Sequence, residues 1–269
     1  MEFRPSARNF LHLRVSPQTF PAEKFSHPRL INIFEQEKDL ILVFEPEDIN
    51  ALLRAVLDFA PQVEILETGL FPSPGPVSGY RLQYTENLVV VSPGGEISPR
   101  EGEIILKTNF SFGSGFHPTT KLSVRLLAEV FERGRPESIF DLGTGSGVLA
   151  LCAVRLGAFR ILAADIDERA VKEARSNVLA NRYEERILVV KGSLSCGRPG
   201  YFDLLLANLT IGTILTLGAG FPSLLRRGGH LILSGFMEAQ LSEIRALYPG
   251  AGLKKVLTEE GWAAALISF

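Results

Sequence analysis

Three glycines at alternate positions, Gly143, Gly145 and Gly147, follow an apolar segment that ends at Asp141-Leu142. Glycine allows a tight turn and lets a ligand approach the backbone closely. If a helix follows, its first turn offers N–H groups that lack partners within the helix. Asp165 closes the next apolar segment, and its carboxylate can accept hydrogen bonds from both hydroxyls of a ribose. We therefore expect a nucleoside pocket where these two segments end.

The spacing of the glycines decides which ligand class fits this pocket. A dinucleotide fingerprint has the form G-x-G-x-x-G, whereas here the third glycine comes one residue early and Val148 follows it. The chain also lacks the G-x-x-x-x-G-K-[ST] pattern of a phosphate-binding P-loop. A nucleoside pocket without a pyrophosphate site suits S-adenosylmethionine. A dinucleotide dehydrogenase is a distant alternative, and a purely structural glycine turn is another.

A sheet must hold these residues, and the pattern of the second part of the chain predicts one. Strand patterns cover residues 88–91, 103–107, 138–141, 160–165, 187–190, 202–207 and 230–234, and helical patterns cover residues 122–131, 148–156, 168–181, 211–225 and 238–247. Such alternation predicts βαβ units, a mainly parallel sheet and helices on both faces. Residues 253–257 and 262–269 are too close for a crossover helix, so we expect an antiparallel hairpin. A pure dinucleotide-binding domain does not end this way.

The first third of the chain has a different pattern. Residues 10–15, 40–44 and 63–67 are β-like, and residues 47–59 have apolar side chains at helical spacing. Residues 71–79 then hold three prolines and two glycines, a composition that is typical of a linker. We expect a small α+β domain over residues 1–76, which would select the substrate, and a catalytic domain over residues 77–269.

Composition and charge exclude several classes of protein. The chain has 269 residues, 28 Lys plus Arg against 30 Asp plus Glu, and a net charge of −2, which argues against direct nucleic acid binding through a basic face. It has no membrane-spanning apolar stretch and no signal-peptide pattern, so we expect a cytoplasmic protein. Its two cysteines, Cys152 and Cys196, support neither a disulfide framework nor a zinc cluster. We expect no metal.

Four stretches of the chain carry a resemblance to a known family. They are residues 112–121 (FGSGFHPTTK), residues 140–150 together with Asp165-Ile166-Asp167, residues 207–209 (ANL) and residues 228–240. With them, the second part of the chain, from about residue 85 onwards, resembles the PrmA family of class I methyltransferases, which modify large-subunit ribosomal protein L11. The resemblance implies a Rossmann-like, seven-stranded sheet with a terminal antiparallel hairpin, S-adenosylmethionine as cofactor, and protein N-methylation.

The resemblance also implies roles for individual residues. It places Asp141, Gly143, Thr144, Gly145, Gly147, Asp165 and Ile166 around the cofactor, and Phe112, His117, Thr119 and Thr120 between the cofactor and the substrate amine. Asn208 would face the reacting nitrogen. Ser193 stands where the family usually has an acidic residue that bonds the adenine amino group, and a serine is a weaker acceptor than a carboxylate.

Asn208 and His117 are the candidate catalytic residues. We hypothesise that the side-chain carbonyl of Asn208 holds the acceptor amine, whose pKa of about 10.4 must fall before its lone pair can react. His117 has a side chain that can act as a general base near neutral pH. The alternative, which we favour, is that its ring bonds a backbone group and shapes the loop, because the amine can lose its proton to solvent.

Three functions follow from these observations. The leading one is a PrmA-like enzyme that methylates lysine or amino groups of a ribosomal protein. A methyltransferase for another protein or a small molecule is the first alternative, because residues 1–76 show no match to the family's recognition domain. A non-catalytic binding module with the methyltransferase fold is the second, and Ser193 is the residue that favours it.

Overall fold

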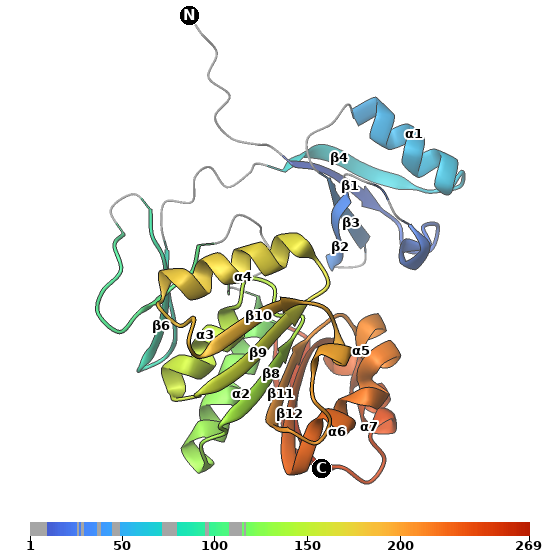
Figure 1. The fold of residues 1–269 in the computed structure, drawn as a ribbon. Coiled ribbons are helices and arrows are strands. Elements are labelled where there is room, and N and C mark those ends of the chain that lie inside the picture. The colour runs from blue at the N-terminus through green and yellow to red at the C-terminus, as the bar shows by residue number, and fades with distance from the viewer. Residues whose placement is uncertain are drawn as a thin grey trace, which may run out of the picture. The chain divides into compact units, whose positions relative to one another are not determined.

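A computed structural model describes residues 10–25, 27, 30–36, 39–44, 49–71, 80–94, 97–107, 115 and 117–269 of the chain. The chain divides into two compact units, Met1–Val77 and Ser78–Phe269, which are drawn as ribbons in Figure 1. Each unit has a hydrophobic core of its own. Within the described residues, no helix has the length and apolar character needed to cross a membrane.

The first unit is a four-stranded antiparallel sheet with one helix. Its strands are β1 (Phe10–Val15), β2 (Leu30–Gln36), β3 (Asp39–Phe44) and β4 (Ile65–Phe71), in the order β2-β3-β1-β4. Helix α1 (Ile49–Phe59) buries Leu52 and Val56 in one core with Leu13 and Phe44 of the sheet. The sequence patterns predicted β1, β3, β4 and α1 but placed no strand over β2.

The second unit is built on a seven-stranded sheet with the order β10-β9-β8-β11-β12-β14-β13. Its strands are β8 (Ser138–Leu142), β9 (Arg160–Asp165), β10 (Ile187–Lys191), β11 (Phe202–Asn208), β12 (Leu225–Met237), β13 (Gly252–Glu259) and β14 (Trp262–Ser268). Strands β8 to β12 are parallel, and β14 pairs antiparallel with both β12 and β13. This confirms the predicted Rossmann-like sheet and its terminal hairpin.

Alternate side chains of these strands enter two core layers, one on each face of the sheet. Ile139 and Leu204 share a layer with residues of α2 (Pro118–Arg133), α3 (Val148–Leu156) and α4 (Glu168–Ala180). Phe140 and Leu205, their neighbours in sequence, share the other layer with residues of α5 (Ile211–Leu217), α6 (Phe221–Leu224) and α7 (Leu241–Leu247). Helices therefore cover both faces, as predicted and as Figure 1 shows.

Two helices predicted as continuous are interrupted. Residues 211–225 form α5, a 3-10 turn at Gly218–Gly220 and α6, and Leu225 already begins β12. Two glycines and Pro222 explain the interruption, because glycine weakens a helix interior and proline removes a hydrogen-bond donor. Residues 238–247 likewise form a 3-10 turn at Glu238–Gln240 followed by α7.

A small three-stranded sheet belongs to the same unit. Its strands are β5 (Tyr80–Thr85), β6 (Leu88–Ser92) and β7 (Ile104–Ile105), in the order β5-β6-β7. Leu88, Val90 and Ile104 are fully buried and belong to the core layer of α3 and α4. The sequence patterns predicted β6 and β7, whereas β5 was missed. This sheet packs against α2 and α3, and α3 directly follows the glycine turn.

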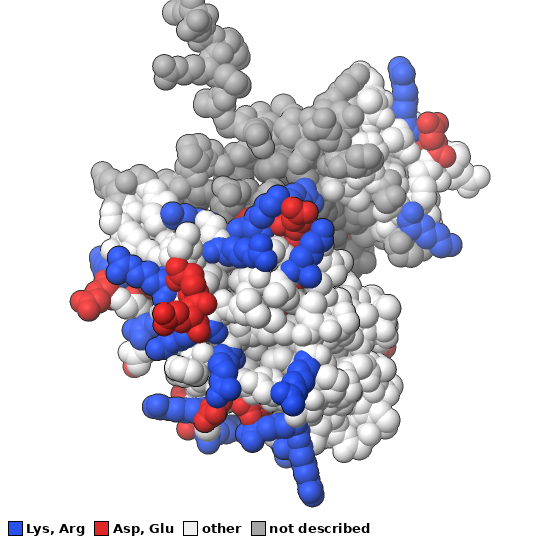
Figure 2. Space-filling view, viewed as in Figure 1, with Lys and Arg blue, Asp and Glu red and all other residues white. Residues whose placement is uncertain are grey.

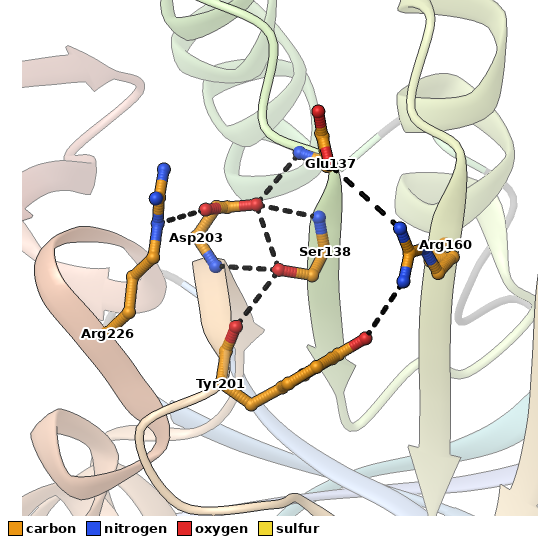
Figure 3. A network of polar contacts seen from close by, with 6 residues as sticks. All are labelled: Glu137, Ser138, Arg160, Tyr201, Asp203 and Arg226. Carbon is orange, nitrogen blue, oxygen red and sulfur yellow. Dashed lines mark hydrogen bonds and ion pairs between the residues drawn. The ribbon is translucent and has the colours of Figure 1, made fainter.

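A network of polar contacts joins the amino ends of β8 and β11 (Figure 3). Oδ2 of Asp203 accepts hydrogen bonds from the backbone N–H of Glu137 at 2.9 Å and from the backbone N–H and hydroxyl of Ser138 at 2.8 Å each. Its other carboxylate oxygen pairs with Arg226, whose side chain is 64% exposed while that of Asp203 is 11% exposed. The network lies at the opposite strand ends from Asp141 and Asn208, so its role is structural.

Replacing Asp203 with alanine is expected to lower the free energy of unfolding by about 3 kcal/mol, because three donors lose a charged acceptor. Arg226→Gln is the control, and it should cost less than about 1 kcal/mol because ion pairs with an exposed partner contribute little. Urea unfolding followed by the fluorescence of Trp262, the chain's one tryptophan, measures both variants. Equal losses would show that the hydrogen bonds at Oδ2 are not the main contribution.

Candidate active site

The glycine turn connects β8 to α3 at the carboxyl end of the sheet. Gly143, Gly145 and Gly147 all have positive φ angles, +71°, +56° and +85°, in the left-handed region that favours glycine. A Cβ atom on Gly143 would also overlap the side chain of Leu209. The turn is fixed to β9, because the carbonyl of Ala164 accepts from the N–H of Gly143 at 2.8 Å and from that of Thr144 at 3.0 Å. The glycine turn is therefore present where the sequence predicts it and is held against β9.

Asp165 ends β9 beside this turn, and both of its carboxylate oxygens are oriented by backbone donors. Oδ2 accepts from the N–H of Gly145 at 2.9 Å, and Oδ1 accepts from the N–H of Asp167 at 2.9 Å. Each oxygen keeps a further lone pair that can accept a hydroxyl proton. Ile166 follows with 73% of its surface exposed, so it presents an apolar side chain beside this carboxylate.

Asp141 lies under the turn and is almost completely buried, with 1% exposure. Its Oδ2 accepts from the hydroxyl of Thr144 at 2.6 Å. Burial raises the pKa of Asp141 from its ordinary value of 3.8 to about 7; the nearby Asp165 adds to this, and hydrogen bonds from Thr144 and the N–H of Ala150 oppose it. Asp141 therefore titrates near neutral pH while it connects β8 to the start of α3.

The raised pKa of Asp141 predicts a change of stability with pH. Between pH 3.8 and about pH 7 the folded protein keeps a proton on Asp141 that the unfolded chain releases. This group therefore lowers the free energy of unfolding as pH rises through that window, by at most about 1.4 kcal/mol per pH unit. Asp141→Asn removes the contribution, so its unfolding free energy relative to wild type should increase from about pH 4 to about pH 7. Urea unfolding across this range measures the difference, and a constant difference would contradict the assignment.

Ser193 follows the end of β10, which lies beside the end of β9. The N–H of Gly192 donates to the backbone carbonyl of Asp165 at 2.9 Å, which brings the end of β10 alongside the end of β9. Ser193 is partly buried and precedes the 3-10 turn Leu194–Cys196, and its side chain makes no capping hydrogen bond to that turn. Its hydroxyl is thus not used to cap the turn.

Charged side chains of both signs surround this strand end. Glu168 pairs with Lys172 at 2.9 Å and with Lys191 at 3.4 Å, and Asp167 pairs with Arg169 at 3.1 Å. Figure 2 shows basic and acidic side chains interspersed on this face of the molecule. The local charge therefore resembles the balanced charge of the whole chain.

Asn208 ends β11, the strand next to β8 in the sheet. Its Nδ2 lies 3.4 Å from the hydroxyl oxygen of Thr120, near the start of α2. That contact uses the amide NH₂ group and leaves the carbonyl oxygen as the acceptor that can face a substrate. Thr119 and Thr120 are both buried, so the start of α2 is packed against this strand end.

Two buried hydroxyls hold α2 in this place. Ser123 donates to the carbonyl of Thr119 at 2.8 Å, and its Oγ lies 2.6 Å from that of Ser234. Ser234 is the direct neighbour of Asn208 in the pairing of β11 with β12. Because the Ser123 proton points to Thr119, the hydroxyl of Ser234 is the donor between the two serines. The pair therefore joins α2 to β12 beside Asn208, a contact that the sequence patterns missed.

His117 directly precedes α2 and caps it. Its Nδ1 accepts from the N–H of Thr119 at 3.3 Å and lies 2.7 Å from the Thr119 hydroxyl. Its ring meets that of Trp262 edge to face, with the ring centres 4.8 Å apart. Burial lowers the pKa of His117, although Glu260 opposes this. With Nδ1 accepting, the neutral ring carries its hydrogen on Nε2, an arrangement suited to shaping the loop; a general-base function of His117 stays a prediction.

The structure thus brings the predicted residues together as two groups at one edge of the sheet. Asp141, Thr144, the three glycines, Asp165, Ile166 and Ser193 form the first group, and His117, Thr119, Thr120 and Asn208 form the second. The groups adjoin because β8 and β11 are neighbours and Leu209 covers Gly143. Phe112 lies outside the described residues. Besides the serine pair, the patterns missed Asn177, whose signal is an asparagine on the apolar face of α4.

Comparisons with known proteins place the second part of the chain in one family. Residues 82–268 match the family described as Ribosomal protein L11 methyltransferase (PrmA). A ribosomal protein L11 methyltransferase of Desulforamulus reducens is 35% identical over 158 residues, which cover 58% of this chain and 51% of the relative. One of Pelobacter propionicus is 33% identical over 223 residues, which cover 75% of this chain and 71% of the relative.

A solved structure supports the same likeness. The crystal structure of a ribosomal protein L11 methylase from Lactobacillus delbrueckii subsp. bulgaricus has a TM-score of 0.61 and 28% sequence identity to this chain. The match covers 70% of this chain and 98% of that structure. The chain spans only 51% to 61% of the length of three of the curated relatives that it matches.

Proposed function

The chain belongs to the ribosomal protein L11 methyltransferase (PrmA) family, and from this membership we propose that it methylates amino groups of a ribosomal protein with S-adenosylmethionine as the donor. The observation that carries the proposal is the left-handed glycine turn beside the oriented carboxylate of Asp165, with Asn208 on the adjoining strand end. The acceptor is part of the proposal because the match covers only part of the relatives' length.

The residues of the first group fit S-adenosylmethionine. The space where a side chain of Gly145 would stand is open, so a ligand can approach the backbone there, and Asp165 offers lone pairs to ribose hydroxyls. Ile166 supplies an exposed apolar surface for the base, and Ser193 supplies a hydroxyl in place of the carboxylate that the family usually has there. When bound, the cofactor supplies a methyl group on a positively charged sulfur, which is already activated for transfer.

The protein's own residues then have to hold and orient the acceptor amine. The carbonyl of Asn208 accepts one N–H of the neutral amine and directs its lone pair towards the donor side of the site. Correct orientation of two reactants can contribute about 7–11 kcal/mol to lowering the barrier. Thr120 fixes the Asn208 amide through the 3.4 Å contact, and His117 fixes the start of the helix that carries Thr120. The proton that the amine must lose passes to solvent before the amine is enclosed.

The first unit, Met1–Val77, is proposed to select the substrate. It is a separate compact unit with its own core, and it precedes the segment of residues 82–268 that matches the family. Since the charge of the chain is balanced, we propose recognition of the ribosomal protein itself rather than of RNA.

Radiolabelled methyl transfer into a total bacterial extract tests this function. We expect the labelled band to be ribosomal protein L11, identified by mass spectrometry. Label in another protein, or only in small molecules, would show that the proposed acceptor is wrong. A chain that gains no thermal stability from millimolar S-adenosylmethionine would instead be a binding module without catalytic function.

A further inference from the structure

Two asparagines, one in helix α4 and one at its carboxyl-terminal cap, hold chain segments that are distant in sequence. Asn177 and Asn181 lie one helical turn apart, and Asn177 is fully buried on the face that also buries Val171, Ala174 and Val178. Asparagine is a poor choice for a helix interior, because its side chain competes for backbone hydrogen bonds. A buried amide is stable only where both of its ends find partners. The partners of these two residues therefore indicate what they do.

Asn177 bridges the glycine turn and the end of the small sheet. Its Nδ2 donates to the carbonyl of Ser146 at 2.9 Å, and its Oδ1 accepts from the N–H of Lys107 at 2.8 Å. Ser146 is 2% exposed and lies between Gly145, which donates to Asp165, and Gly147, which begins α3. The side-chain amide of Asn177 thus bonds the glycine turn and also the backbone just beyond β7.

Asn181 makes equivalent bonds that do not reach the turn. Its Oδ1 accepts from the N–H of Ile105 at 2.8 Å, and its Nδ2 donates to the carbonyl of Ile105 at 2.6 Å and to that of Asn177 at 2.7 Å. Asn181 therefore bonds both the N–H and the carbonyl of Ile105, as a neighbouring strand would, and so attaches β7 to the end of α4. Both amides bond the backbone at or just beyond β7, and they differ in that Asn177 also bonds the carbonyl of Ser146.

After Lys107, the next residues that the structure describes are Gly115 and His117, and His117 belongs to the second group of site residues. The hydroxyl of Tyr84, on β5, donates to the carbonyl of Gly115 at 2.9 Å. Asn177 of α4 therefore holds the backbone at Lys107, and Tyr84 of the small sheet holds it at Gly115. The side chain of Asn177 contacts both Lys107 and the glycine turn.

We propose that Asn177 is a positioning residue of the methyl-transfer site: it orients the glycine turn and couples this turn to the backbone at Lys107, just beyond β7. The proposal rests on the proposed function, because the turn has to bind S-adenosylmethionine for its orientation to matter. Coupling is reciprocal. A cofactor that stabilises the turn must then also stabilise the bond between Asn177 and the N–H of Lys107.

Asn177→Asp and Asn181→Asp make a matched pair. Each variant keeps an oxygen that accepts the backbone N–H, from Lys107 in one case and from Ile105 in the other, and each loses the amide NH₂ donor. Only in Asn177→Asp does a carboxylate oxygen then face the carbonyl oxygen of Ser146. Titration calorimetry with S-adenosylmethionine should show Kd raised at least about tenfold in Asn177→Asp, or about 1.4 kcal/mol, and less than about threefold in Asn181→Asp. Asn177→Ala, which adds no charge, should show the same loss of cofactor affinity. It replaces Asn177→Asp in the experiment if that variant does not fold.

Hydrogen exchange at the amide of Lys107 separates positioning from a merely structural role. Saturating S-adenosylmethionine should slow this exchange in wild type and in Asn181→Asp but not in the Asn177 variants. Equal Kd values in the two Asp variants would overturn the positioning role, and so would slowing of Lys107 exchange by the cofactor in Asn177→Asp. Either result would leave the proposed function intact as long as the wild-type protein binds S-adenosylmethionine. A wild-type chain that does not bind the cofactor would overturn both.

Discussion

Asn208→Ala is expected to lower kcat at least about 100-fold, because a small misplacement of one reactant costs about that much in rate. The Kd of S-adenosylmethionine should stay within about threefold of wild type, since Asp165 and the glycine turn, on neighbouring strand ends, are proposed to bind the cofactor. The reason for the large effect is geometric: the carbonyl of Asn208 is the group at the end of β11 that can accept an amine N–H, because Thr120 takes the amide NH₂ group. Single-turnover methyl transfer and calorimetry measure the two quantities separately.

Thr120→Val is the control for this prediction. It removes the hydroxyl that contacts Asn208 and keeps the shape of a buried side chain, so the amide loses a partner but its carbonyl remains. We expect kcat to fall about five- to tenfold, since the lost contact is long and contributes about 1 kcal/mol. If turnover of Asn208→Ala stayed within about threefold of wild type, Asn208 would not hold the amine.

Asp165→Ala should raise the Kd of S-adenosylmethionine at least about 100-fold, which corresponds to about 2.7 kcal/mol. The carboxylate has two tasks, because it accepts the N–H of Gly145 at 2.9 Å and so holds the turn, and it offers lone pairs to the ribose. Hydrogen bonds to a charged group contribute about 1.5–3 kcal/mol each, so the loss of two or more accounts for the expected effect. Equilibrium binding at constant ionic strength measures it.

Asp167→Ala tests whether this effect is local to Asp165. Asp167 lies two residues further on, where its carboxylate accepts from the N–H of Arg169 at 2.8 Å and caps α4. Its removal should cost about 1 kcal/mol of stability and change the cofactor Kd less than about threefold. Equal losses of affinity in both variants would mean that negative charge near the turn, rather than the position of the Asp165 carboxylate, controls binding.

The fold could be predicted where burial imposes a strong pattern. Strand β8 is buried along its whole length and is followed by three glycines, so its type and end were clear from the sequence. Strand β5 has only partly buried or exposed residues, so its hydrophobic signal is weak and it was missed. The interruption between α5 and α6 depends on Gly218, Gly220 and Pro222, which break a helical pattern that the apolar residues otherwise continue.

The site could be predicted where its residues follow one another along the chain. The glycine turn, Asp165 and the His117 region are short local motifs, and the structure places them at one edge of the sheet. Contacts between distant residues left no such signal: Asn208 meets Thr120 across 88 positions, and Asn177 meets Lys107 across 70. Local patterns report turns and faces, whereas these bonds depend on which strands become neighbours in the sheet.

The most direct test of the central claim is the intact mass of purified ribosomal protein L11 after incubation with the full chain and S-adenosylmethionine. We predict a mass increase in steps of one methyl group with the wild-type protein and at least about a 100-fold slower increase with Asn208→Ala. An L11 mass that does not change with wild-type protein, while the same preparation binds S-adenosylmethionine, would contradict the proposed acceptor.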